Sequence, residues 1–306
     1  MAQFFGLPIF VGMILGIAFP FAAVEASTMA VFFLIVLMIS AGLSVNWENI
    51  QHIPSRLRET IIGLVFGFIV FPLLLYVPAY YLLTDDQFLY GFVFSSLCPI
   101  AMVAPYFSRI HNGDSEYAMI LVVASMVLCP LLAPFVLSYS FSTSAALNLL
   151  PLIRYMTLLI ILPTIIGFLI TRFLPRLRII ISRFEGLVNS LILGLLVFSL
   201  FGNAVGKLNT AYTETEEILG LIFLVFLQDF GVLFICRYFI SVLLKPGVTN
   251  ALIIGLSMKN VAIAAGVLLI YDPRASFAPA VAFVAHGFLF SFLAIPRISS
   301  WLFKLK

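Results

Sequence analysis

The chain has 306 residues, of which 63% are hydrophobic and 9% are charged, and its mean hydropathy is +1.20. Soluble domains carry about 25% charged residues, so this composition predicts a polytopic membrane protein and leaves almost nothing for a soluble domain. The net charge of +3 comes from residues scattered through short loops, which argues against a nucleic-acid-binding surface. The three cysteines are far apart in apolar surroundings, a pattern typical of free buried thiols and not of a disulfide framework or a zinc site.

Apolar runs separated by polar breaks predict ten membrane-spanning helices, because a span needs about 20 mainly apolar residues. The runs lie near residues 4–23, 28–45, 60–83, 87–110, 115–140, 148–172, 185–206, 217–243, 249–270 and 277–302. No basic leader precedes the first run, so we interpret it as a retained helix and not as a signal peptide. The predicted fold is an all-α polytopic membrane protein with short linkers.

The distribution of charge between alternate loops supports this count and orients the chain. Loops on one predicted side hold eleven basic residues: Arg56, Arg58, Arg109, Arg172, Arg176, Arg178, Arg183, Lys245, Arg297, Lys304 and Lys306. Loops on the opposite side hold two, Lys207 and Arg274, together with acids such as Glu214 and Glu217. By the positive-inside rule the first side, with both termini, is cytoplasmic. The expected location is the cell (inner) membrane, with multiple passes.

An internal repeat is indicated at an offset of 155 residues. Two prolines and a glycine recur in the same order and spacing, Pro8, Gly12 and Pro20 as Pro163, Gly167 and Pro175. The offset divides the chain into a half of five helices over 1–146 and a second over 147–306. Because five is odd, the halves must have opposite orientations in the membrane. An inverted repeat with broken helices at matching places points to a transporter binding site.

Two of the ten segments are expected to break inside the membrane. Pro99 and Pro105 each remove a backbone donor from the fourth segment. The ninth segment reads Gly-Leu-Ser-Met-Lys-Asn from Gly255, which puts Lys259 and Asn260 in apolar sequence. Irregular backbone at this depth must be enclosed by protein or line a water-filled cavity. The ends of half-helices commonly hold ions at such breaks.

Three ionisable residues at membrane depth are functional candidates. A lysine there costs about 2.5–3.5 kcal/mol on insertion scales, so we expect Lys259 to pair with Asp229 of the eighth segment, in a pair that proton or substrate binding opens and closes. A purely structural pair is the alternative. His286 is either a buried neutral side chain or a group that carries protons or touches substrate. Further candidates flank the two breaks: Cys98, Ala104, Pro105, Tyr106, Ser108, Ser257, Met258 and Asn260; Ser40, Gly42, Asn189 and Asn203 are weaker polar candidates.

Four landmarks give the chain a resemblance to the bile acid:sodium symporter family, within a superfamily of bile acid, arsenite and related transporters. They are Ser40-Ala-Gly-Leu-Ser, Cys98-Pro, Gly113-Asp and Met258-Lys-Asn, in that order over nearly the whole length. The resemblance implies a panel domain of helices 1, 2, 6 and 7 and a core domain of helices 3–5 and 8–10, in which broken helices 4 and 9 cross. It also implies an alternating-access carrier of organic anions.

The chain departs from this family where the resemblance implies oxygen ligands for sodium. Those positions hold Ala104, Pro105, Ala118, Val122, Gly67, Gly255 and Lys259, while Asn260 is kept. We therefore expect a sodium-independent member in which the Lys259 ammonium replaces the charge of bound sodium. Facilitated diffusion, exchange and proton coupling are all open as modes of transport, and the expected partners are a small organic anion, protons and the lipid bilayer.

Several other functions compete with that of a sodium-independent carrier. A sodium-coupled organic-anion symporter and an arsenite-type efflux permease, with Cys98 as a soft ligand, are the nearest alternatives. An intramembrane enzyme would need a nucleophile with its base or a metal motif, and neither His-Glu-x-x-His nor Gly-x-Ser-x-Gly occurs. A channel suits broken helices around a charged pair less well than a closed site does. No nucleotide-binding loop is present, so ATP drive, nucleotides, metals and cofactors are not expected.

Overall fold

The computed structural model describes residues 7–45, 47–140, 149–208, 215–295 and 303. In these ranges the regular structure is helical, and the extended backbone pairs once, in an isolated bridge between Ile100 and Lys259. Both chain ends lie outside the described residues, as do Glu214, Arg297, Lys304 and Lys306, which were used above to assign the sides of the membrane.

In the described part of the chain, five continuous helical stretches are long and apolar enough to cross a membrane: Pro54–Leu82, Ser115–Ser138, Leu149–Phe173, Glu185–Ala204 and Thr215–Phe234. A sixth span is possible if α1 (Leu7–Ala18) and α2 (Pro20–Ser27) count as one, although they bend by 115°. The other predicted segments fall on shorter apolar helices or on interrupted ones. The ten-span layout therefore stays a prediction.

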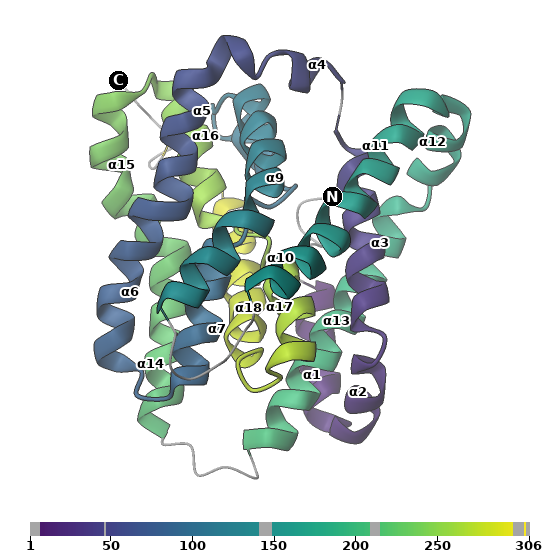
Figure 1. Cartoon of the computed structure of the whole chain (residues 1–306), viewed down its shortest axis with the longest axis vertical. Coiled ribbons are helices and arrows are strands. Elements are labelled where there is room, and N and C mark those ends of the chain that lie inside the picture. The colour runs from purple at the N-terminus through teal and green to yellow at the C-terminus, as the bar shows by residue number, and fades with distance from the viewer. Residues whose placement is uncertain (1–6, 46, 141–148, 209–214, 296–302, 304–306) are drawn as a thin grey trace.

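One group of helices forms the right-hand side of the molecule in Figure 1. In it α1 and α2 pack against α13, while α3 packs against α11 and α13. The bounds of the members not yet given are α3 (Ala30–Leu43), α11 (Leu162–Phe173), α12 (Pro175–Ser182) and α13 (Glu185–Leu208). We call α1, α2, α3, α11, α12 and α13 the first group.

Two corners in the first group have the same backbone conformation. Phe19, between α1 and α2, has φ −129° and ψ 61°, and Leu174, between α11 and α12, has φ −125° and ψ 58°. Each corner is followed by a proline at the first position of an eight-residue helix, where a missing N–H is tolerated. The two corners are 155 residues apart, so the repeat seen in the sequence has a matching local structure.

Glycines allow the first group to pack closely, and one of them gives a testable result. A Cβ added to Gly167 would lie 2.0 Å from the carbonyl oxygen of Ile39, which belongs to rigid helix backbone. We expect Gly167→Ala to destabilise the fold by about 1–3 kcal/mol through overpacking. Gly186→Ala is the matched control, because no atom lies within 4 Å of its added Cβ. Melting curves in detergent should separate the two variants, and equal melting temperatures would contradict this packing.

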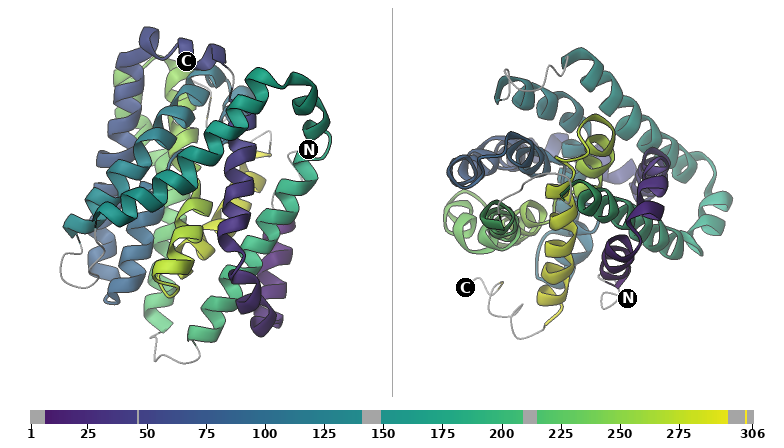
Figure 2. Two further views of the ribbon diagram at one scale, coloured as in Figure 1. Left: turned by 45° about the vertical axis from the view of Figure 1, so that its right-hand side comes forward. Right: turned by 90° about the horizontal axis from the view of Figure 1, so that it is seen from below.

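The remaining helices form a second group, on the left and in the centre of Figure 1. Figure 2 shows α10 and α11 as one oblique helical run that passes from the second group to the first. The members of the second group are α5 (Leu57–Val65), α6 (Phe71–Leu82), α7 (Asp86–Leu97), α8 (Ala104–Ile110), α9 (Ser115–Ser140), α10 (Leu149–Met156), α14 (Thr215–Phe226), α15 (Val232–Leu243), α16 (Pro246–Ser257), α17 (Val261–Tyr271) and α18 (Phe277–Leu293). Short π-helical turns interrupt three spans: η3 (Phe66–Val70), η4 (Thr157–Ile161) and η5 (Leu227–Gly231). In α16 and α17, all residues from Val248 to Ser257 and from Val261 to Leu269 are buried.

Polar contacts join the loops at one end of the molecule, which includes α4 (Trp47–Gln51) and η2 (Pro54–Arg56). Arg56 binds Asp114 at 2.5 Å, and the Asp114 N–H donates to the Gly247 carbonyl at 2.9 Å. The Arg172 guanidinium lies 5.7 Å from the centre of the Trp47 ring. These contacts bring together four of the loops that carry the basic residues.

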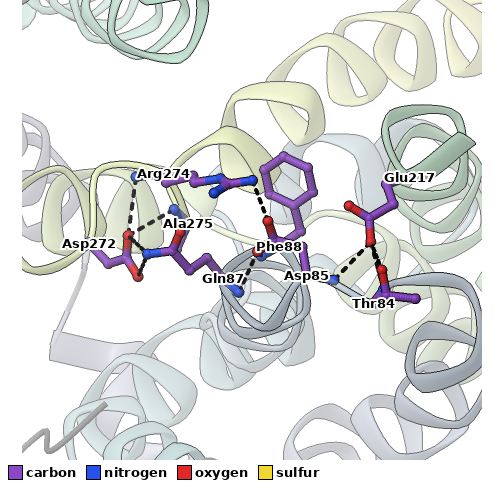
Figure 3. A network of polar contacts seen from close by, with 8 residues as sticks. All are labelled: Thr84, Asp85, Gln87, Phe88, Glu217, Asp272, Arg274 and Ala275. Carbon is purple, nitrogen blue, oxygen red and sulfur yellow. Dashed lines mark hydrogen bonds and ion pairs between the residues drawn. The ribbon is translucent and has the colours of Figure 1, made fainter. Parts of the chain in front are cut away.

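A second network joins loops at the opposite end (Figure 3). Glu217 accepts hydrogen bonds from Thr84 and from the Asp85 N–H, and Arg274 binds Asp85 at 2.5 Å. Asp272 accepts from the Gln87 side chain and from the backbone that follows it. Three of the loops that alternate-side counting assigns to the acidic side are thus in contact with one another.

Candidate functional site at the crossing of two unwound segments

Both predicted helix breaks are present. Helix α7 ends at Leu97 and α8 begins at Ala104; α16 ends at Ser257 and α17 begins at Val261. In the first break Pro99 lacks an N–H, and in the second the chain leaves the helical region at Met258, with φ −119° and ψ 82°. Each break leaves backbone donors and acceptors that need partners at membrane depth.

The two unwound segments supply those partners to each other. The Ala101 N–H donates to the Met258 carbonyl at 2.8 Å, and the Asn260 N–H donates to the Pro99 carbonyl at 2.7 Å. These bonds flank the antiparallel bridge between Ile100 and Lys259. The crossing is therefore fixed by backbone hydrogen bonds between segments that are far apart in the sequence.

A serine of α9 completes the crossing and gives a second testable result. The Ser125 hydroxyl accepts the Ile100 N–H at 3.1 Å and donates to the Val122 carbonyl. Ser125→Ala leaves that N–H buried and unpaired, so we expect a loss of about 1–3 kcal/mol. Ser138→Ala is the matched control, since the Ser138 hydroxyl makes only the corresponding local bond among the described residues. Thermal unfolding in detergent checks the prediction, and an unchanged Ser125→Ala protein would refute it.

Lys259 carries its ammonium into the second group of helices. The side chain is 2% exposed, and Nζ donates to the Gly67 carbonyl at 2.9 Å. Gly67 belongs to η3, and a π-helical turn leaves backbone groups free for other partners. The rings of Phe68 and Phe71 lie with their centres 5.6 and 5.9 Å from Nζ, within the range of cation–π attraction.

The expected pair between Lys259 and Asp229 is wrong. Within the described ranges, no carboxylate lies within 4.0 Å of the Lys259 ammonium, and Asp229 instead faces His286, with Oδ1 3.3 Å from Nε2. Lys259 reaches toward η3, whereas Asp229 lies in η5 and faces α18. The two charged groups therefore have separate partners, Gly67 for Lys259 and His286 for Asp229.

A cavity of about 410 Å³ lies between the two groups of helices. On the second group, its wall consists of Ala101, Met102, Val103, Lys259, Asn260, Val261, Ala262, Phe283, His286 and Phe290. Of the eleven candidates at the breaks and at membrane depth, Lys259, Asn260 and His286 line it. Asp229 lies behind His286.

The other candidates surround the crossing without lining this cavity. Tyr106 is 43% exposed, whereas the rest are buried: Cys98, Ala104, Pro105, Ser108, Ser257 and Met258. The free Cys98 thiol is fully buried. Because these side chains are buried next to the two helix breaks, we assign them to the packing of the unwound segments.

The opposite cavity wall carries several polar side chains, including an acid that the sequence did not single out. Glu185 accepts a hydrogen bond from Ser40 at 2.9 Å and from Arg178 at 2.6 Å, and Asn189 donates to the Ser40 hydroxyl at 2.6 Å. Glu185 and Asn189 lie four residues apart at the start of α13, and therefore on one helix face. That spacing, read together with Ser40, was the signal that could have identified Glu185.

This arrangement can hold an anion that has an apolar body. One buried ammonium and the N-terminus of α17, where the helix dipole is positive, lie on one wall. Hydroxyl and amide groups line the other, together with the Glu185 carboxylate, whose charge is balanced by Arg178, and apolar surface lies between them.

Two comparisons with known proteins bear on the family of this chain. A family model described as Sodium Bile acid symporter family matches residues 31–214, which is more than half of the chain. The chain is also similar to an uncharacterized sodium-dependent transporter, YocS, of Bacillus subtilis (strain 168), with 22% identity over 135 residues. That similarity covers 44% of this chain and 42% of YocS, so the chain spans less than half the length of this curated relative. The chain is a multi-pass membrane protein that belongs to the Sodium Bile acid symporter family of transporters.

Proposed function

We propose that this protein is a secondary carrier of small organic anions that works by alternating access and does not need sodium. The observation that carries the proposal is the buried Lys259 ammonium, held by the Gly67 carbonyl at the crossing of the unwound segments. A fixed positive charge there can do what a bound cation does for an anionic substrate in the cavity. Two unit charges about 8 Å apart attract by about 2 kcal/mol at an effective dielectric constant near 20.

The surroundings of Lys259 also favour a fixed charge over a sodium ion. Gly67 has no side chain, and a Cβ there would lie 3.7 Å from Nζ, so the ammonium occupies the space beside the π-helical turn. Gly255 and Ala104 bring no side-chain oxygen to the crossing. A cation placed beside the ammonium would be repelled by it.

For transport we propose a fold of ten membrane-spanning segments, arranged in two inverted halves, 1–146 and 147–306. The matching corners at Phe19 and Leu174 support it, as do the two breaks. We identify the first group of helices, together with α10, which runs on into α11, with the panel domain, and the other members of the second group with the core domain. The cavity extends to Ser182 and Glu185, near the basic loops, so this conformation opens toward the cytoplasm if those loops are cytoplasmic.

Two other functions, those of a sodium-coupled symporter and an arsenite permease, can be compared with the proposed one. The name of YocS describes that protein as sodium-dependent, which favours a sodium-coupled symporter as the second candidate. An arsenite permease receives no support from the cavity, because Cys98 is fully buried and does not line it. We assign the cavity to transport and not to catalysis, and we assign it no metal or cofactor.

Uptake into proteoliposomes tests the proposal. Labelled pyruvate, taurocholate and arsenite are offered in sodium chloride and, separately, in choline chloride. We expect one of the two organic anions, pyruvate or taurocholate, to enter at the same rate in both salts. A sodium requirement would overturn the sodium-independent mechanism, and entry of arsenite alone would overturn the substrate class.

A further inference from the structure

The carboxylate of Asp229 is buried with few polar neighbours. Asp229 is 0% exposed, and neither of its oxygens has a hydrogen bond of good geometry among the described residues. The neighbouring Gln228 is equally buried, and its amide atoms lack partners in the same part of the chain. His286 Nε2, 3.3 Å from Asp229 Oδ1, is the one group within ion-pair distance. A buried carboxylate with so little solvation is costly unless charge or a proton compensates it.

His286 joins this carboxylate to the transport cavity. Its side chain lines the cavity together with Lys259 and Asn260, and it also faces Asp229. The imidazole of His286 therefore links the cavity to Asp229 and can pass a proton from one to the other. π-helical turns such as η5, which holds Asp229, frequently mark functional sites.

The helices packed against the pair carry the other titratable groups in its neighbourhood. Helices α14, α15, α16 and α18 pack against η5, while α1, α7, α13 and α17 also pack against α18. Helices α1 and α16 contain no titratable residue. The others contribute Glu216, Glu217, Cys236, Arg237, Tyr238, Asp86, Tyr90, Glu185, Lys207 and Tyr271. Among those whose side chains the structure describes, Glu185 is the one that lines the cavity, and its charge is balanced by Arg178 at 2.6 Å.

We propose that the Asp229–His286 pair is a proton-binding site and that one proton travels with each monovalent organic anion. The inference rests on the proposed function and names its coupling ion. The proton is shared between His286 Nε2 and Asp229 Oδ1, so the pair has a net charge of −1 without it and 0 with it. The proton enters from the side to which the cavity is open and leaves on the opposite side with the anion.

Charge balance explains why the two ligands move together. In the empty carrier the Lys259 ammonium balances the Asp229 carboxylate, so the site is neutral. An anion alone makes the site −1, a proton alone makes it +1, and both together return it to zero. Because a net charge at membrane depth is costly, the half-loaded carriers reorient about 100-fold less often than the two neutral ones. Transport is then electroneutral with a one-to-one ratio.

The test measures uptake of labelled pyruvate and taurocholate into proteoliposomes loaded with a pH dye. An inward proton gradient is expected to accumulate the carried probe above equilibrium, with one proton entering per anion. A protonophore abolishes accumulation, and a potassium diffusion potential with valinomycin has no effect. Uptake that ignores the proton gradient, or that follows the potential, would overturn the inference and leave the proposed function standing.

Asp229→Asn gives a distinct signature. Without the titrating carboxylate, the empty carrier holds the uncompensated Lys259 charge, while the anion-loaded carrier is neutral. We expect exchange of internal for external anion to persist, while net uptake falls about 100-fold and loses its response to pH. Ser291→Ala, on the same helix as His286, is the control and keeps proton-driven uptake. Proton-driven net uptake by Asp229→Asn would overturn the inference.

The outcomes remain separable if a variant does not fold. Loss of exchange together with a loss of monodisperse protein marks a folding failure, and the wild-type stoichiometry and potential measurements then decide alone. If neither labelled pyruvate nor labelled taurocholate enters or exchanges through wild-type protein, the proposed function fails and this inference fails with it.

Discussion

Replacing Lys259 with methionine is expected to reduce the initial rate of carboxylate uptake about 100-fold, because losing one member of a buried charge arrangement costs about 2–5 kcal/mol of binding. Methionine has a similar length, so it can keep the packing against Phe68 and Phe71 while removing the charge. Initial rates in proteoliposomes measure the effect.

The same variant separates a functional charge from a structural one. Replacing a buried charge by a well-packed apolar side chain is often neutral or stabilising, so we expect the Lys259→Met protein to melt close to wild type. Ile263→Met is the control, because Ile263 is fully buried in the first turn of α17 and has no charge to lose. Full transport by Lys259→Met would contradict the role assigned to the ammonium, and loss of folding would assign it to structure.

Filling the cavity is expected to stop transport without unfolding the protein. Ala101 is partly exposed in the unwound segment and lines the cavity, so Ala101→Phe places a ring where the anion would lie. Its N–H still donates to Met258, since a side-chain change leaves that backbone bond available. We expect uptake of labelled carboxylate to fall by at least about tenfold, equivalent to a lost binding free energy of about 1.4 kcal/mol.

An alanine outside the cavity provides the comparison. Ala22 is exposed on α2 and does not line the cavity, so Ala22→Phe should transport like wild type. Equal uptake by Ala101→Phe and wild type would mean that the substrate does not pass this cavity.

Local backbone chemistry made the helix breaks predictable. Pro99 has no backbone N–H to donate, whatever its surroundings. Lys259 and Asn260 are polar residues within an apolar segment. Both interruptions could therefore be predicted without coordinates. The corners at Phe19 and Leu174 follow from the prolines that come next. In each case the cause lies within a few residues of the effect.

Features that depend on how helices are rotated against one another were missed. The partner of Lys259 is a carbonyl of Gly67, which a π-helical turn makes available, and no side-chain pattern marks such a carbonyl. Pairing by charge alone favoured Asp229, but the phase of η5 turns Asp229 toward His286. Glu185 was missed because its role arises from contact between α3 and α13, which are distant in sequence.

The span count shows a similar limit. Hydropathy counts apolar residues and does not sense where a helix stops, so the segment near 28–45 looked like a full span although α3 covers Ala30–Leu43. The same reasoning applies to the segment near 4–23, which holds a sharp bend. Length along the sequence is a poor guide to length across a membrane when a chain bends or unwinds.

The most direct test of the central claim is the melting temperature of purified protein in detergent, titrated with sodium chloride and, at equal ionic strength, with choline chloride. A ligand that binds the folded state at 100 times its dissociation constant stabilises it by about 2.7 kcal/mol. Because the Lys259 ammonium already fills the cation position, we predict identical melting temperatures in the two salts. A saturable rise in sodium alone would contradict this account.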